Sequence, residues 1–478
     1  MVRPTATETA TTVTTRGAGW ALASLALSML LSSLGVSIAN VALPTLAQAF
    51  GASFQAVQWV VLAYLLAITV LIVGVGRLGD VVGRRRVLLG GLLVFAAASV
   101  LCGLAPTLGT LIAARALQGL GAAALMALTV ASVGASVPPE RTGSAMGLLG
   151  TMSAIGTALG PSLGGLLIAG PGWRAIFLAM AGLGVVTFGL AWRWLPDRER
   201  KATAGPAGFD VPGTLLLGLT LAAYALAMTV GNGRFAGANL ALLLAAAFGA
   251  GLFVAVEARA KSPLIRPSAL RDAGLGSGLA ANALVSTVMM ATLVVGPFYL
   301  SHGLGLDAAA VGAVMSLGPL VSAFSGVPAG RIVDRFGAPA MVGSGLAAMA
   351  AGCLALALLP GLLGVAGFVA AIAVLTPGYQ LLLAANNTAV MTGVGPDRKG
   401  VVSGLLSLSR NLGLITGASV MGTVFALAAA TDDFATAGPE AVAAGMRITF
   451  AVAGGLMVLA LVVATAGRPR RPLTEDAG

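Results

Sequence analysis

The sequence has few charged residues, and this scarcity excludes a soluble globular domain. Only 9% of its 478 residues are charged, whereas 58% are hydrophobic. A soluble domain carries about 25% charged residues. The medium around most of the chain must therefore be lipid, and the sequence predicts an all-α integral membrane protein.

Residue types that build catalytic and metal sites are also rare. The chain has one histidine, His302, and two cysteines, Cys102 and Cys353, which fall in different predicted spans. This pattern argues against a structural disulfide and against a metal site. A membrane-embedded enzyme would need clustered catalytic side chains at membrane depth, and the sequence shows none. We therefore expect no enzymatic activity and no cofactor, and we expect His302 to be a solvated loop residue.

Long uncharged stretches give the number of membrane crossings. A helix needs about 20 mainly apolar residues to cross the hydrocarbon core. Stretches of this kind predict spans at residues 20–39, 56–76, 87–104, 108–132, 143–169, 175–195, 211–230, 238–256, 274–300, 308–329, two within 336–396, then 400–430 and 448–466. The sequence thus predicts 14 transmembrane helices.

The basic residues predict the orientation of these spans. Arg174, Arg234 and Arg447 fall in loops on one side, Arg115 and Arg410 fall within spans, and the remaining Lys and Arg lie on the side of the N-terminus. Loops rich in Lys and Arg stay in the cytoplasm. We expect a multi-pass protein of the inner (plasma) membrane with both termini cytoplasmic. The net charge of +11 is spread over many short loops, so we do not expect it to bind nucleic acid.

An internal repeat organises the chain. Two ordered sets of residues recur at nearly one period, which chance does not readily produce. Gly76, Arg77, Asp80 and Gly83 recur 254 residues later as Gly330, Arg331, Asp334 and Gly337; Arg141, Gly143, Gly147, Gly156 and Gly160 recur 257 residues later as Arg398, Gly400, Gly404, Gly413 and Gly417.

The repeat predicts two six-helix bundles, at residues 19–200 and 272–467. Residues 201–271 form a linker with two inserted transmembrane helices, and residues 1–18 and 468–478 are expected to be disordered cytoplasmic tails. Secondary transporters use repeats of this kind to build two bundles that rock about a site near the midplane.

The segment GRLGDVVGRRR at 76–86 resembles a signature of the major facilitator superfamily, and the whole chain resembles its fourteen-span drug:proton antiporters. The resemblance implies the major facilitator fold. It also implies a cytoplasmic gate, in which charge-assisted bonds latch helix ends. The gate residues are Gly76, Asp80, Gly83, Arg84, Arg85, Asp334 and Arg335. The alternative is a cluster that only fixes topology.

Arg115 and Gln118 in the fourth span resemble the family pattern R-x-x-Q-G. A charge inside the membrane is costly, so it normally faces a cavity or pairs with another group. By resemblance, Arg115 assists proton transfer. The alternative is a helix-stapling arginine that binds backbone carbonyls.

The segment GTALGPSLGG at 156–165 resembles the antiporter signature of family exporters, and the resemblance implies export. Its glycines recur every four residues and form a stripe against which a neighbouring helix can pack closely. The residues of this motif are Gly156, Gly160, Pro161, Gly164 and Gly165.

The first span departs from the family pattern. Family exporters carry an acidic residue before the string N-V-A-L-P, whereas this chain has Gly35 there and retains Asn40. A proton carrier must titrate while accessible from both sides. The nearest acids, Asp210 and Glu257, fall close to the ends of spans, so proton antiport rests on the family resemblance.

Arg410 has no charged counterpart in the first repeat, where Ser153 is equivalent. Two buried cations, Arg115 and Arg410, would favour an anionic substrate; alternatively, Arg410 binds carbonyls or reaches the interface. With Gln118 and Asn40, both arginines are candidates for the proton and substrate pathway. Pocket candidates by resemblance of position are Trp59, Tyr64, Met126, Asn282, Met289 and Met290.

These observations predict a secondary active exporter of small amphipathic compounds such as drugs or antibiotics. Its expected partners are the substrate, protons and membrane lipid, and we expect a monomer. The sequence contains no G-x-x-x-x-G-K-[ST] loop, so it does not indicate ATP-driven pumping. The alternatives are a dedicated metabolite or lipid exporter with different coupling, and a nontransporting receptor on the same scaffold.

Overall fold

The computed structural model describes residues 15–136, 142–196, 211–230, 237–260, 273–392, 399–430 and 437–466. Every regular element in these ranges is a helix. The helices are α1 (Thr15–Phe50), α2 (Phe54–Val82), α3 (Arg84–Leu104), α4 (Leu108–Ser136), α5 (Thr142–Ala169), α6 (Arg174–Trp194), α7 (Val211–Thr229), α8 (Gly237–Arg259), α9 (Ala273–Phe298), η3 (Tyr299–Gly303), α10 (Ala308–Phe336), α11 (Ala338–Met391), α12 (Lys399–Thr416), η5 (Gly417–Met421), α13 (Gly422–Ala428) and α14 (Pro439–Ala466). The predicted tails lie outside the described residues, except that residues 15–18 belong to α1.

Among the described helices, 13 are long and apolar enough to cross a membrane. Helix α11 has 54 residues and contains a non-helical residue, Gly364, with φ of 55°. A Cβ built on Gly367 would lie 2.9 Å from the Pro360 nitrogen, so the chain folds back on itself at this point. Helix α11 therefore crosses twice, and the predicted 14 transmembrane helices are confirmed.

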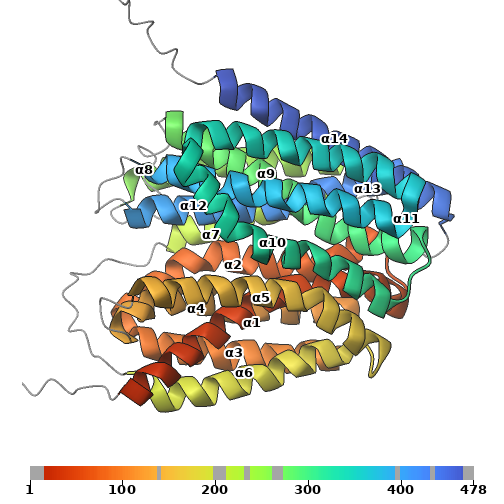
Figure 1. The fold of residues 1–478 in the computed structure, drawn as a ribbon. Coiled ribbons are helices and arrows are strands. Elements are labelled where there is room, and N and C mark those ends of the chain that lie inside the picture. The colour runs from red at the N-terminus through yellow and green to blue at the C-terminus, as the bar shows by residue number, and fades with distance from the viewer. Residues whose placement is uncertain are drawn as a thin grey trace, which may run out of the picture.

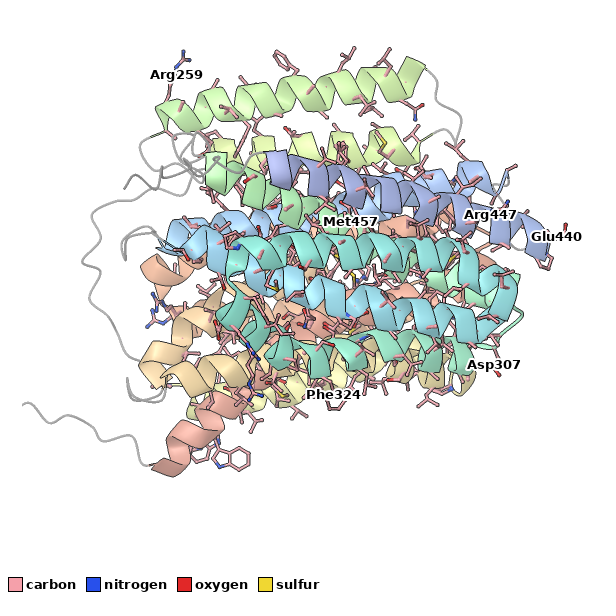
Figure 2. All side chains as sticks on the ribbon, turned by 45° about the horizontal axis from the view of Figure 1, so that its top comes forward. Arg259, Asp307, Phe324, Glu440, Arg447 and Met457 are labelled. Atoms are coloured by element: carbon pink, nitrogen blue, oxygen red, sulfur yellow. The ribbon has the colours of Figure 1, made fainter. Side chains whose placement is uncertain are left out.

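The helices form two bundles side by side (Figure 1). Helices α1 to α6 pack on one another in the first bundle, and helices α9 to α14 form the second. Helix α1 begins and α14 ends at the same end of the molecule, here called the terminal end. The opposite end, which holds the α1–α2 connection, is called the distal end. Charged residues gather at both ends: Asp307, Glu440 and Arg447 are distal and Arg259 is terminal (Figure 2).

Helices α7 and α8 are the inserted pair, and they lie against the outside of the bundles. Helix α7 contacts α2 of the first bundle and η5 of the second, and α8 packs on α7. Figure 2 shows α8 at the margin of the molecule. Its side chains Leu240, Leu244 and Phe248 are exposed. An apolar exposed face of this kind suits contact with lipid acyl chains.

The helices that carry the first repeated motif continue beyond the predicted ends of their spans, residues 76 and 329, which corrects the sequence prediction. Helix α2 continues through Val82, and α10 continues through Phe336. Each helix stops at the glycine that ends its motif, Gly83 with φ of 111° and Gly337 with φ of 85°. Only glycine adopts such backbone angles without strain, so one residue in each repeat makes the turn.

Candidate functional site

Arg115 is fully buried in the first bundle, and its side chain bonds to two neighbouring helices. The exposed fraction of Arg115 is 0%. Its Nε donates to the Val60 carbonyl in α2 at 2.9 Å, and its Nη2 donates to the Gly35 carbonyl in α1 at 2.9 Å. Its Nη1 donates to Gln118 Oε1 on its own helix. The guanidinium thus ties α4 to α1 and α2.

Two further contacts extend this cluster. The guanidinium carbon lies 4.1 Å from the centre of the Tyr64 ring, a cation–π contact. Gln118 Nε2 donates to Ser99 Oγ in α3 at 2.6 Å. The cluster therefore joins four helices, and every described partner of Arg115 is uncharged. This geometry is that of the helix-stapling alternative.

Tyr64 occupies the space that a side chain at position 35 would need. Its hydroxyl donates to the Ser32 carbonyl at 3.0 Å, and a Cβ built on Gly35 would lie 2.5 Å from Tyr64 Oη. The sequence interpretation named Tyr64 only as a pocket candidate and missed this role. The sequence feature that could have indicated this role is Gly35 itself, because a glycine leaves space for a side chain from a neighbouring helix.

The glycine stripe of α5 packs on α1, as its spacing predicts. A Cβ on Gly156 would lie 2.5 Å from the Leu30 carbonyl oxygen, and one on Gly164 would lie 2.7 Å from a methyl group of Val41. A Cβ on Gly160 would overlap the Ser37 hydroxyl. The Ser37 hydroxyl also donates to the Gly156 carbonyl at 3.2 Å, and α5 remains helical through Pro161.

Gly165 points the other way and contacts the second bundle. A Cβ built on it would lie 3.0 Å from the Cα atom of Gly312 in α10 and would also meet the Ala308 carbonyl. Helices α5 and α10 therefore meet backbone to backbone. The motif thus has two structural faces, one inside its own bundle and one at a seam between the bundles.

Aromatic side chains close the distal end between the bundles. Phe54 at the start of α2 packs on Phe298 of α9, with ring centres 4.6 Å apart, and on Phe425 of α13, with ring centres 5.5 Å apart. His302 stacks on Phe298, and its Nε2 lies 3.4 Å from Gln48 Nε2 at the end of α1. His302 is half-buried in η3, so the expectation of a solvated loop residue was wrong.

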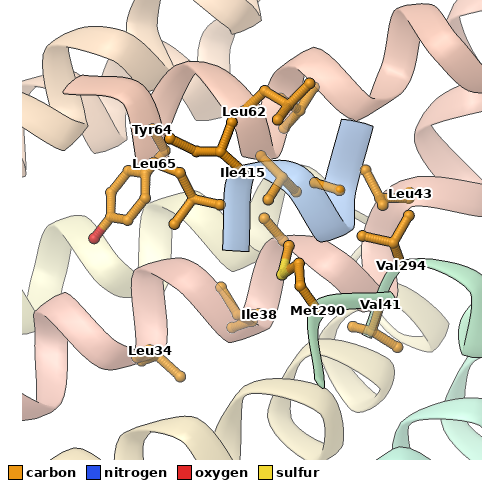
Figure 3. Close-up of a cluster of buried hydrophobic side chains, with 14 of the residues drawn as sticks. Leu34, Ile38, Val41, Leu43, Leu62, Tyr64, Leu65, Met290, Val294 and Ile415 are labelled. Carbon is orange, nitrogen blue, oxygen red and sulfur yellow. The ribbon is translucent and has the colours of Figure 1, made fainter. Parts of the chain in front are cut away.

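Apolar side chains from both bundles pack together next to this closure (Figure 3). The cluster is buried and contains no charged residue among those labelled. Its labelled members are Leu34, Ile38, Val41 and Leu43 from α1, Leu62, Tyr64 and Leu65 from α2, Met290 and Val294 from α9, and Ile415 from α12. A polar solute can pass here only if the bundles separate, because the side chains exclude water.

The other pocket candidates contact different helices and do not form one group. Trp59 Nε1 donates to Thr229 Oγ1 in α7 at 3.0 Å, and Asn282 Nδ2 donates to the Leu406 carbonyl in α12 at 2.8 Å. Met126 and Met289 are half-buried beside the main core. Asn40 is buried and donates to the Val36 carbonyl at 2.8 Å, within α1.

The gate candidates lie at the terminal end. Arg84 Nη1 donates to the Ala131 carbonyl at 2.6 Å, and Arg85 Nη2 donates to the Trp192 carbonyl at 2.7 Å. Asp334 and Arg335 are exposed. Gly76 lies within α2, and the side chain of Asp80 lies outside those that the structure describes.

Arg410 does not form a second buried cation. Its side chain is exposed on α12, whereas its repeat counterpart Ser153 is half-buried, with its Oγ 2.7 Å from Ser33 Oγ. Of the two alternatives for Arg410, the exposed side chain agrees with the one in which it reaches the interface and not with a buried cation. An argument for an anionic substrate from paired buried charges has no support in this arrangement.

The chain belongs to the major facilitator superfamily, because the model of that family matches residues 25–418 and 279–477. Several of the similar proteins are named as multidrug or drug-efflux transporters. The chain is 32% identical to the multidrug resistance protein Stp of Mycobacterium tuberculosis over 419 residues, which cover 84% of this chain and 74% of that protein. It is 28% identical to the riboflavin transporter RibZ of Clostridioides difficile, over 84% of this chain and 87% of that protein.

The fold also agrees with solved transporter structures. An inward-facing bacterial homologue of the human lysosomal transporter Spinster superposes with a TM-score of 0.72 at 16% identity, covering 95% of this chain and 97% of that chain. At this identity the likeness concerns the fold alone. The protein is therefore a multi-pass membrane transporter of small molecules, built on the major facilitator fold.

Proposed function

We propose that this protein exports small amphipathic organic compounds by alternating access, with proton antiport as the energy source. The observation that carries the proposal is the distal closure. Phe54, Phe298 and Phe425 seal the distal end of the interface between the two bundles. A solute can leave by this end only after the bundles rock apart, as in other repeat-built transporters.

The direction of transport is supported by the glycine-proline motif of α5 and by the relatives. The motif resembles that of family exporters, and the relative Stp is named as a multidrug resistance protein. We further propose that the terminal end faces the cytoplasm, since the described basic residues Arg84, Arg85, Arg259 and Arg335 lie there.

Proton coupling needs a carrier other than Arg115. An arginine guanidinium stays protonated in proteins, and every described partner of Arg115 is neutral. We propose that Arg115 and Gln118 maintain the bundle and that the proton binds elsewhere. The second candidate function is a dedicated metabolite exporter with different coupling, which the similarity to a riboflavin transporter favours.

The test is efflux from proteoliposomes preloaded with several amphipathic dyes, with and without a pH gradient. Wild type is compared with Gly165→Leu, which places a large side chain into the contact with α10. The matched control is Gly150→Leu on the same helix, where a Cβ meets nothing within 4 Å. We expect gradient-driven efflux in wild type and in the control, and loss of efflux in Gly165→Leu.

Each other outcome selects an alternative. Efflux that is indifferent to the gradient would refute proton antiport and favour the dedicated exporter. Dye binding without flux in any variant would refute transport and favour a receptor. Equal efflux by Gly165→Leu and Gly150→Leu would show that transport does not need the close contact of α5 with α10.

A further inference from the structure

The internal repeat relates two of the contacts between the bundles, here called the first and the second seam. The first seam is the contact of Gly165 in α5 with Gly312 in α10. Adding 257 to the first position gives Gly422, and subtracting 254 from the second gives Gln58. The structure places Gln58 of α2 against Gly422 of α13. The second seam is therefore the repeat equivalent of the first.

The two seams differ in the residue at one position. At the first seam two glycines allow the helix backbones to touch. At the second seam Gln58 inserts a side chain, whose Cδ lies 3.0 Å from a Cβ built on Gly422. Gln58 is 1% exposed, and neither atom of its amide has a hydrogen-bond partner among the described residues. A buried amide without partners opposes closure, so the second seam needs support from elsewhere.

Helix α7 supplies contacts to the α2 side of this seam. Trp59 Nε1 donates to Thr229 Oγ1 at 3.0 Å, and a Cβ on Gly218 would lie 3.3 Å from a Val70 methyl group. The two residues on α2 are eleven apart, and so are the two on α7. Eleven residues make about three helical turns, so α7 lies antiparallel along one face of α2.

The same helix also bonds to the second bundle. Tyr224 Oη donates to Thr416 Oγ1 at 3.1 Å. The Thr423 hydroxyl has two acceptors for its one proton, the Met228 carbonyl at 2.5 Å and the Ser419 carbonyl at 2.8 Å, and the shorter contact is the one to α7. Tyr224 and Met228 are four apart and share a face of α7. Thr416 and Thr423 flank the π-helix η5, a type of segment that is frequent at functional sites.

The contacts of α7 lie beside the seam itself. On α2, Gln58 faces the second bundle and the next residue, Trp59, bonds to α7. On α13, Gly422 faces α2 and the next residue, Thr423, bonds to α7. We propose that α7 is a clasp that holds the second seam shut at the distal end. Opening requires the hydrogen bonds of α7 to the second bundle, made by Tyr224 and Thr423, to break. Helix α7 therefore sets how readily the transporter opens at the distal end.

The clasp rests on the proposed alternating access, and its test measures opening without transport. The reporter is Gln58→Cys in a background of Cys102→Ala and Cys353→Ala, which removes the two native thiols. Position 58 is buried when the seam is shut, so its reaction rate with a polar thiol reagent reports the open population. The protein is held in lipid nanodiscs, where both ends are accessible. The clasp variants are Tyr224→Phe alone and Tyr224→Phe with Thr423→Val.

The matched control is Thr220→Val on the same helix. Thr220 faces α8, because its Oγ1 lies 2.5 Å from a Cβ built on Gly249, and its hydroxyl has no hydrogen-bond partner among the described residues. The control thus removes a hydroxyl from α7 without touching either bundle. Size-exclusion profiles and helix content establish that each variant is folded.

We expect labelling to accelerate about threefold in Tyr224→Phe and about tenfold in the double variant, relative to the control, since one and two hydrogen bonds are removed. Labelling of both variants within a factor of about two of the control would overturn the clasp. Dye efflux from the same proteins separates the two proposals. Faster labelling without efflux in any variant would keep the clasp and refute transport, whereas efflux with unchanged labelling would refute only the clasp.

Discussion

Replacing Arg115 with lysine tests whether this residue staples helices or takes part in transport. The substitution keeps the positive charge but removes the planar fork of donors. The Arg115 side chain holds the carbonyls of Val60 and Gly35 and the amide of Gln118, which belong to three different helices. A single ammonium group on a flexible chain can keep one of these bonds in place of three.

The expected cost follows from the two lost bonds. A hydrogen bond from a charged donor contributes about 1.5–3 kcal/mol, so the first bundle loses about 3 kcal/mol at the lower limit. For a folding unit of about 150–250 residues this corresponds to a fall in Tm of about 6–12 °C. The measurement is thermal unfolding of the purified protein in detergent, followed by intrinsic fluorescence.

The control is Arg174→Lys, the same substitution at an exposed arginine. Arg174 makes one long hydrogen bond, of 3.4 Å, to the Ala105 carbonyl. We expect its Tm to change by less than about 2 °C. An Arg115→Lys protein that keeps the wild-type Tm and loses only gradient-driven efflux would refute the stapling role and would return Arg115 to the transport pathway.

Three further substitutions test the packing of small residues. Gly156→Ala should destabilise the protein by about 1–3 kcal/mol in thermal unfolding, because its Cβ would meet a carbonyl of α1; Gly150→Ala on the same helix should not, and equal effects would contradict this packing. Gly35→Asp should lower Tm by displacing the Tyr64 hydroxyl, and added Tyr64→Phe should restore part of the loss; no restoration would show that the clash lies elsewhere. Gly83→Ala should lower the free energy of unfolding by about 1 kcal/mol or more, and Tm with it, since alanine is strained at φ of 111°; an unchanged Tm would mean that the turn adapts.

The number of crossings and the two-bundle architecture can be predicted from the sequence alone. Uncharged stretches of sufficient length mark the spans because lipid cannot solvate a charge or a bare backbone. The recurrence of Gly83 as Gly337 marks the same turn in both repeats, since each needs a backbone angle that only glycine adopts freely. The stripe of Gly156, Gly160 and Gly164 predicts close helix packing, because residues four apart share one face of a helix and glycine has no side chain to hold a neighbour away.

Which helix each side chain contacts depends on how the helices pack in three dimensions. A membrane helix is apolar on all sides, so its pattern does not separate residues that face lipid from residues that face protein. Nothing in residues 211–229 marks Gly218 and Thr229 as neighbours of α2, or Tyr224 as a neighbour of α12. In the same way, the filling of the space beside Gly35 by Tyr64 depends on how α1 and α2 pack. These contacts join segments far apart in the chain, and no local pattern of residues specifies them.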